Sequence, residues 1–354
     1  MWVLSHEPSE GQYREGRHHR VIAAGRGLNV SSNIRVLTGH PATARPLVGR
    51  FLPWIALVGI WFLWGSTYIG IRYAVRTIPP YLMGGSRYCI AGGLLLLIVA
   101  VRYRGLQGVT LRQVLSAGIA GSAMLLGGNG LVSVGEQHLQ SGVAALLVAT
   151  VPLVMTVETA VVRGRGLPAR SVGAIALGSA GVVMLVGAPG TAVNYMAAGA
   201  VFLGAFFWAT GSVYLTVAEL PRNPLITTGL EMGIGGALML LVGLATGELG
   251  SLHLAAVTQA SVLGWLWLIG PGALLGFSAY TYALKTLPTS TVATYAYINP
   301  VVAVVLGTLM GDQSLSLGVL LGGTAVVSAV AVTLIHPRPR RIEVVPEEAV
   351  AEIA

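Results

Sequence analysis

Two apolar stretches of the sequence carry a proline at corresponding places, and one of them also carries polar side chains that can bind a solute. SGVAALLVATVPLV (residues 141–154) aligns with TSTVATYAYINPVV (residues 289–302) so that Pro152 falls on Pro300. A proline inside a helix removes a backbone hydrogen bond and frees a carbonyl group. In a membrane, such a break is tolerated only against protein or a water-filled cavity. We therefore expect Pro152 and Pro300 to break helices beside a cavity.

Polar residues around Pro300 have two interpretations. Tyr295 and Asn299 can line a substrate path near the middle of the membrane, or they can bond neighbouring helices. For Thr291 and Thr294 the structural interpretation is favoured, because hydroxyl groups in membrane helices commonly bond to helix carbonyls.

Aromatic residues and one amide are further candidates for substrate binding. FLW (residues 62–64) resembles FFW (residues 206–208), so Trp64 and Trp208 can form matching walls of one cavity or can simply pack. Small or hydroxyl residues follow each tryptophan and precede an aromatic residue, Tyr68 in the first case and Tyr214 in the second. We include Tyr214 as a candidate. Asn129 lies in LLGGNGLVS, where glycines allow close approach of another helix, so that Asn129 either bonds that helix or lines the cavity.

Three charged residues lie within apolar segments, where burial is costly. Arg87 can bind a substrate carboxylate, although we favour extension of its side chain to the nearby interface. Glu231 can relay a proton or contact a substrate amine, or it can make a structural hydrogen bond. Glu158 lies near Arg163, which favours a local ion pair.

Enzyme chemistry has little support. Cys89 is the sole cysteine, and no cluster of histidines is expected within the apolar core, so we expect no metal site and no cofactor. GFSAY (residues 276–280) places Ser278 after a Gly-x pair, but no histidine is positioned to act as its base, which leaves an intramembrane hydrolase as a remote alternative. A channel is also disfavoured, because rings of charged residues are lacking.

The elements that must position these residues are membrane-spanning helices. Hydrophobic residues make up 54% of the 354 residues and charged residues only 10%, against about 25% in soluble proteins. Apolar runs of about 20 residues recur, which is the length that crosses a bilayer as a helix. Ten spans are expected, near residues 51–71, 80–101, 113–134, 141–162, 171–188, 197–217, 225–247, 260–284, 290–310 and 317–335.

The basic residues predict the orientation. With the N-terminus inside, 18 of the 21 Lys and Arg residues lie on the inner side and two lie outside. This bias predicts cytoplasmic termini. It also explains the net charge of +8 without nucleic-acid binding.

The chain is expected to contain two copies of one five-helix unit, at residues 51–188 and 195–335. The tryptophan and the proline lie 88 residues apart in the first copy and 92 in the second. An odd number of spans inverts the second copy relative to the first, which is common in secondary transporters. Residues 1–46 are interpreted as a disordered cytoplasmic extension, and residues 336–354 as a cytoplasmic tail.

Several motifs, in order and spacing, resemble the EamA family of the drug/metabolite transporter superfamily, in its YedA-like branch. They are WGSTYIGIRYAV (64–75), GNGLVSVGEQHLQSGVAALLVATVPL (128–153), FFWATGSVY (206–214) and ATYAYINPVVAVVLGTLMGDQSLS (293–316). The resemblance implies a ten-helix carrier of a bacterial inner membrane, often an exporter of amino acids or other metabolites. After its proline helix the family has Gly-Glu, where this chain has Gly311-Asp312 and, in the first copy, Gly164-Arg165.

The sequence thus predicts an all-α polytopic transporter that exports a small neutral or zwitterionic metabolite by alternating access. A multidrug or toxic-compound efflux carrier is the alternative. The expected partners are the solute, the lipid bilayer and a coupling proton, and the protein is expected to be a monomer or a homodimer.

Overall fold

A computed structural model describes residues 47–103, 108–187 and 194–334, and this part of the chain is helical without β-strands. The predicted all-α class is therefore confirmed. The expected N-terminal extension and C-terminal tail lie outside the described residues.

Nine helical stretches of the described chain are long and apolar enough to cross a membrane. The ninth expected span, near residues 290–310, is divided into two helices. Its main helix, Tyr295–Leu309, is therefore shorter than the nine others. The helices are α1 (Leu47–Gly65), α2 (Thr67–Ala74), α3 (Pro80–Tyr103), α4 (Leu111–Gly121), η1 (Ser122–Asn129), α5 (Gly130–Gly135), α6 (Ser141–Val148), α7 (Val151–Val162), α8 (Ala169–Gly187), α9 (Tyr195–Leu215), α10 (Pro224–Ala245), α11 (Glu248–Ser251), η2 (Leu254–Ala256), α12 (Gln259–Trp267), η3 (Leu268–Leu275), α13 (Gly276–Thr286), α14 (Thr289–Val292), α15 (Tyr295–Leu309) and α16 (Leu317–Leu334).

Polar side chains cap several of these helices. The hydroxyl of Thr110 accepts from the backbone of Gln113 while the Gln113 side chain accepts from the backbone of Thr110, so that α4 begins with a capping box. The side chains of Asn194 and Asn223 accept backbone N–H groups at the starts of α9 and α10. These contacts fix where the helices begin after their loops.

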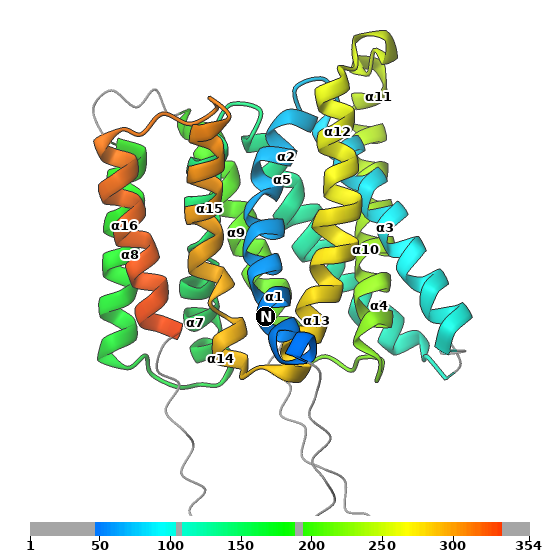
Figure 1. Ribbon diagram of the computed structural model, residues 1–354, viewed down its shortest axis with the longest axis horizontal. Helices are drawn as coiled ribbons and strands as arrows, with labels where there is room; N and C mark the ends of the chain where they lie inside the picture. The colour runs from blue at the N-terminus through cyan, green and yellow to red at the C-terminus, as the bar shows by residue number, and fades with distance from the viewer. Residues whose placement is uncertain (1–46, 104–107, 188–193, 335–354) are drawn as a thin grey trace, which may run out of the picture.

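The two halves of the chain pair with each other in matching order. The second long helix of the first half, α3, packs along its counterpart α10, and α8 packs along α16 (Figure 1). Glycines permit the close approach: a Cβ built on Gly92 would lie 2.7 Å from the backbone nitrogen of Gly233, and one on Gly181 would lie 2.8 Å from the carbonyl of Gly322. Likewise α1 packs on α13, and α9 packs on η1 and α5.

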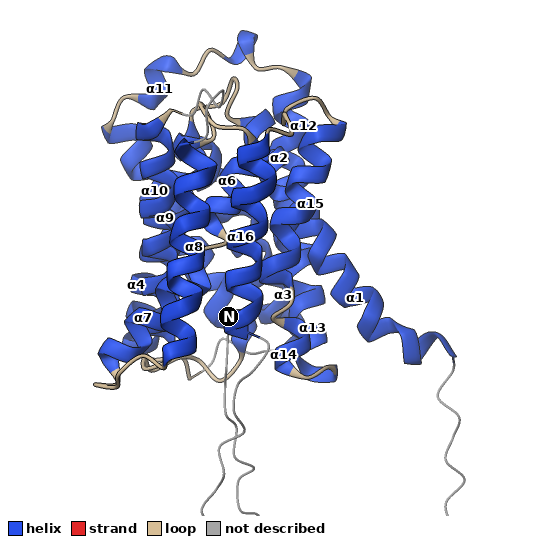
Figure 2. Cartoon of the chain, turned by 90° about the vertical axis from the view of Figure 1, so that its left-hand side faces the viewer, coloured by secondary structure: helices blue, strands red, loops and turns tan. Residues whose placement is uncertain are grey.

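The start of α1 and the end of α16 lie at the same end of the bundle, the lower end in Figures 1 and 2. We call the opposite end, where α2, α5 and α15 finish, the distal end. The short segment α11 lies at this end (Figures 1 and 2).

Two helices contain a π-helical segment that the sequence analysis missed. Residues Ser122–Asn129 (η1) interrupt the span that continues into α5, and residues Leu268–Leu275 (η3) interrupt the corresponding span of the second half. Pro271 lies inside the second segment, where it cannot donate a backbone hydrogen bond. A π segment inserts extra backbone into a helix, and such segments are frequent at functional sites.

The predicted helix breaks do not fall at the prolines. Pro300 lies inside α15, which continues through it, and the interruption in the second half falls at residues 293–294, between α14 and α15. Pro152 lies at the start of α7. There its missing N–H costs nothing, because the first N–H groups of a helix have no partner within it. The interruption in the first half falls at residues 149–150, between α6 and α7.

Candidate functional site

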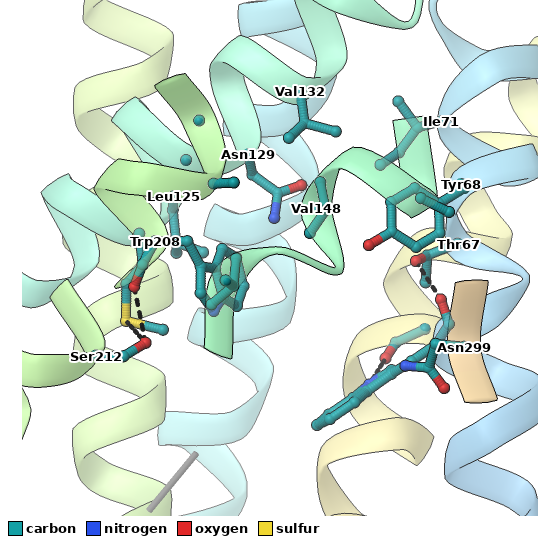
Figure 3. Close-up of a pocket in the computed structure, with 18 of the residues that line it drawn as sticks. Thr67, Tyr68, Ile71, Leu125, Asn129, Val132, Val148, Trp208, Ser212 and Asn299 are labelled. Carbon is teal, nitrogen blue, oxygen red and sulfur yellow. Dashed lines mark hydrogen bonds between the residues drawn. The ribbon is translucent and has the colours of Figure 1, made fainter. Parts of the chain in front are cut away.

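A central cavity of about 230 Å³ lies between the two halves of the chain. Its wall is mainly apolar and includes residues of η1 and η3, so both π segments line it. Figure 3 shows the cavity with Asn129, Leu125 and Trp208 on one side and Tyr68, Thr67 and Asn299 on the other. A mostly apolar cavity with a few converging polar groups is the usual form of a small-molecule site.

Arg87 of α3 lies in this wall and is 4% exposed. Its Nη2 donates to Asn129 Oδ1 at 2.6 Å and to the Tyr88 hydroxyl at 2.8 Å, and its guanidinium stacks over the Tyr88 ring at 4.3 Å. The favoured interpretation, extension to the interface, is therefore wrong. The side chain turns inward because Asn129 supplies an acceptor in the centre of the bundle.

Two carboxyl groups in spans differ in their surroundings. Glu231 of α10 lines the cavity and is buried, and its Oε1 has no hydrogen-bond partner among the described residues. Glu158 of α7 does not form the expected ion pair with Arg163. Its Oε1 instead accepts from the hydroxyl of Thr210 on α9 at 2.7 Å. Glu231 is thus a candidate site residue, and Glu158 joins two helices.

Trp64 lies at the centre of an aromatic cluster. Its ring centroid is 5.0 Å from that of Tyr295, 5.2 Å from that of Tyr280 and 5.4 Å from that of Phe277. The indole nitrogen donates to the carbonyl of Gly272 at 3.2 Å. All five residues line the cavity, so this cluster forms one aromatic wall of it.

Trp208 forms a wall at the other side. It packs against Gly128 of η1, where a built Cβ would lie 3.2 Å from the ring. In each half, therefore, the tryptophan of the first long helix contacts the π-segment region of the other half. Tyr214 is not brought to the cavity. It lies six residues beyond Trp208 on α9, nearly two helical turns away along the axis, which carries it past the wall.

Asn299 lines the cavity. With its amide oriented so that the nitrogen faces the carbonyls of Tyr295 and Trp61, it donates to each at 3.2 Å and joins neighbouring backbone segments. The Thr294 hydroxyl accepts from the Trp61 indole at 3.0 Å and donates to the Thr291 carbonyl at 2.7 Å. Thr294 therefore joins helices, in agreement with its structural interpretation.

Several lining residues were missed as candidates. Tyr68, Tyr88 and Phe277 were not singled out, yet all three contribute to the cavity, as does Tyr280. Tyr68 follows Trp64 by one turn, which is a signal that helical spacing could have provided. Phe277 and Tyr280 are brought in by the π segment that precedes them.

Nothing in the described residues favours enzyme or metal chemistry. The described chain holds no group of three or more His, Cys, Asp or Glu side chains suited to a metal. The hydroxyl of Ser278 donates to the Leu274 carbonyl at 2.7 Å, a bond within its own helix that is typical of structural serines.

Comparison with known proteins provides an independent line of evidence. A model of the EamA-like transporter family matches residues 52–187 and again residues 196–335. The chain is 36% identical over 284 residues to the uncharacterized inner membrane transporter YedA of Escherichia coli (strain K12), covering 79% of this chain and 90% of that protein. It is 23% identical over 298 residues to the WAT1-related protein At3g02690, chloroplastic, of Arabidopsis thaliana, covering 81% and 70%.

The fold also has a counterpart among solved structures. A protein crystal structure matches with a TM-score of 0.54 and 18% identity, over 81% of this chain and 96% of the other. At this identity the match concerns the fold alone.

Proposed function

The chain belongs to the EamA-like transporter family, and from this premise we propose that it exports a small zwitterionic metabolite, such as an amino acid, across the inner membrane. That it is a multi-pass transporter of the inner membrane follows from the family and from the apolar helices. The substrate class, the direction and the mechanism are the parts we propose.

One observation carries the choice of substrate: Arg87 and Glu231 line the same small cavity and are not paired with each other. Arg87 donates through Nη2 to the neutral amide of Asn129 and to the hydroxyl of Tyr88. Its Nε has no hydrogen-bond partner among the described residues. Glu231 Oε1 likewise has none. A buried guanidinium is suited to a carboxylate, and a buried carboxyl to an ammonium group. An amino acid carries both groups.

The cavity also bears on the alternative of multidrug efflux. Its volume of about 230 Å³ is below the range of about 300–1,000 Å³ typical of pockets for drug-sized ligands. The aromatic wall around Trp64 can contact an apolar side chain of the solute. Size and charge together favour a small metabolite over a large apolar drug.

The proposed mechanism is alternating access. The two matched segments act as inverted five-helix repeats that rock about the central cavity, with both termini in the cytoplasm and the distal end outside. The cavity lies between the halves, and helices of one half pack on their counterparts in the other, which supports this arrangement.

Counterflow in proteoliposomes tests the proposal. Vesicles loaded with one unlabelled amino acid are diluted into the labelled form, and each amino acid is tested in turn. We expect saturable, transient accumulation, which a carrier gives and a pore does not. Arg87→Gln should strongly weaken it at low amino-acid concentration, and Arg112→Gln, which removes only an exposed ion pair with Glu219, is the matched control. Absence of counterflow with every amino acid, from protein shown to be folded, would contradict the substrate class.

A further inference from the structure

Glu136 is a buried carboxyl group that lies outside the central cavity and that the proposed substrate contacts do not use. It follows the last residue of α5 at the distal end and is fully buried. Neither carboxyl oxygen has a hydrogen-bond partner among the described residues. An ionised carboxylate in such a position is strongly disfavoured, because it has lost water and gained no donor.

The residues above Glu136 tie the two halves together at the distal end. Arg72 of α2 donates through Nη1 to the backbone carbonyls of Glu136 at 2.6 Å and Gln137 at 2.9 Å. Its Nε donates to Asp312 Oδ1 at 3.1 Å, and Asp312 Oδ2 accepts from the backbone nitrogen of Ser141 at 3.0 Å. Asp312 belongs to the turn after α15, so these bonds join α2, α5 and α6 of the first half to the second half.

Charged and titratable groups face Glu136 from several elements. They are Tyr68 and Arg72 of α2, Arg87 of α3 and Asp312 of the turn after α15. Helix α9 also packs against the end of α5, and there it presents the apolar residues Ala197 and Val201.

The balance of these groups favours a proton on Glu136. Burial, reinforced by the Asp312 carboxylate, raises the pKa of Glu136 well above its ordinary value, against the opposing charges of Arg72 and Arg87 and the smaller opposing effect of the Arg72 backbone. The two arginines do not reverse the balance, because their guanidinium groups donate to other acceptors and none donates to this carboxyl.

A metal cation is a poor alternative to the proton. The guanidinium of Arg72 touches the main chain of Glu136 itself, and it would repel a cation at the neighbouring carboxyl. A proton neutralises the carboxyl without adding charge beside Arg72.

We propose that Glu136 is a proton-binding site of the transport cycle, occupied while the distal end is closed over it and vacated when the two halves part there. The inference rests on the proposed transport function and gives it a coupling group. When the halves part, water reaches the carboxyl and stabilises its ionised form. Closing again buries the carboxyl, so a proton must bind first.

Because proton binding at Glu136 is linked to closing of the distal end, the direction of the pH effect is determined. The closed state binds the proton more tightly than the open state, so acid favours closing and rising pH favours opening at the distal end. In the membrane this end faces the outside under the proposed topology. External protons would therefore promote closing of the distal end after the solute has been released outside.

The proposal can be tested without any substrate, by the accessibility of a cysteine next to Arg72, whose hydrogen bonds join the two halves at the distal end. In a Cys89→Ser background, Ile71→Cys places a thiol at a buried residue of the cavity wall, and Gln137→Cys places one on the exposed distal surface. A membrane-impermeant thiol reagent is added outside, and the rate at residue 71 is divided by the rate at residue 137 at each pH. The division removes the pH dependence that the reagent itself has with an exposed thiol.

We expect this ratio to rise several-fold between about pH 5.5 and 8.5 in the carrier with Glu136. Glu136→Gln, which mimics the protonated form, should give a low ratio at every pH, and Glu219→Gln should behave as the parent. Glu136→Asp keeps a titrating group and should keep a pH dependence with a shifted midpoint. A flat ratio in the parent, or the parent's rise in Glu136→Gln, would overturn the proposal. If Glu136→Gln does not insert, loss of the pH dependence in Glu136→Asp would also overturn it. None of these outcomes depends on counterflow, so the two proposals fail separately.

Discussion

Arg87 Nη2 lies 2.6 Å from Asn129 Oδ1, so the buried guanidinium of α3 is held by a neutral partner from the end of a π segment. An amide orients the arginine without cancelling its charge. The positive charge therefore remains available to a solute in the cavity, and this relationship is the basis of the first prediction.

Arg87→Gln should lower the apparent affinity for a solute carboxylate by about 10-fold or more, because a charge-assisted hydrogen bond contributes about 1.5–3 kcal/mol. Arg87→Lys should retain part of the affinity, since it keeps the charge and loses the planar donor pair. The concentration dependence of counterflow measures both. Equal affinity in Arg87→Gln and the parent would show that the carboxylate binds elsewhere.

Glu231→Gln should weaken recognition of the solute's ammonium group. In the parent, an amino acid should compete at least about 10-fold better than its N-acetyl derivative, and in Glu231→Gln this preference should largely disappear. Competition with labelled substrate in counterflow measures the preference. Glu219→Gln, which changes an exposed carboxylate, is the control and should retain it. A preference that survives in Glu231→Gln would remove this residue from the site.

Gly276→Ala should displace Trp64, because a built Cβ would lie 2.5 Å from the indole nitrogen. Overpacking of this kind costs about 1–3 kcal/mol of stability. We expect a lower thermal midpoint in detergent and weaker substrate binding. Gly270→Ala is the matched control in the adjoining π segment, where a built Cβ has no neighbour within 4 Å. If both variants melted like the parent, the close approach of Trp64 to Gly276 would be contradicted.

Gly92→Ala should destabilise the contact between α3 and α10. A Cβ on Gly92 would lie 2.7 Å from a backbone nitrogen of α10, and backbone cannot move aside as a flexible side chain can. A loss of about 1–3 kcal/mol is expected from overpacking. Gly93→Ala, at the next residue, faces open space and should be neutral or stabilising by up to about 1 kcal/mol through helix propensity. Thermal unfolding of the purified variants distinguishes the pair, and equal midpoints would contradict the packing argument.

The membrane class was predictable because it depends on averages over long segments. Mean apolarity over about 20 residues indicates a span, whatever its neighbours are. Asn299 was predictable as a cavity residue, since an amide in an apolar run must face protein or water. The tryptophans were predictable from their matching positions in the two halves, and the cavity is where the three residues converge.

Features that depend on local backbone register could not be predicted in the same way. Tyr214 was expected in the cavity because its motif resembled that of Tyr68, but the resemblance does not fix depth along the helix axis. The side chain of Arg87 could extend outward or inward, and only the position of Asn129 on another helix decides between them. Glu136 falls between two expected spans, and its burial depends on the packing of segments that are distant in the sequence, Arg72 and Asp312 among them.

The two π segments make the backbone form of these spans a determinant of the site. A π turn accommodates about one residue more than an α turn, and each residue of an α-helix advances the chain by about 100°. If the residues of η3 instead formed a regular α-helix of the same length, all of α13 would be turned by about that angle. Phe277 and Tyr280 would then point away from Trp64, although no lining side chain had been substituted. In this protein, a change of helix type at unchanged sequence would change which side chains form the binding site.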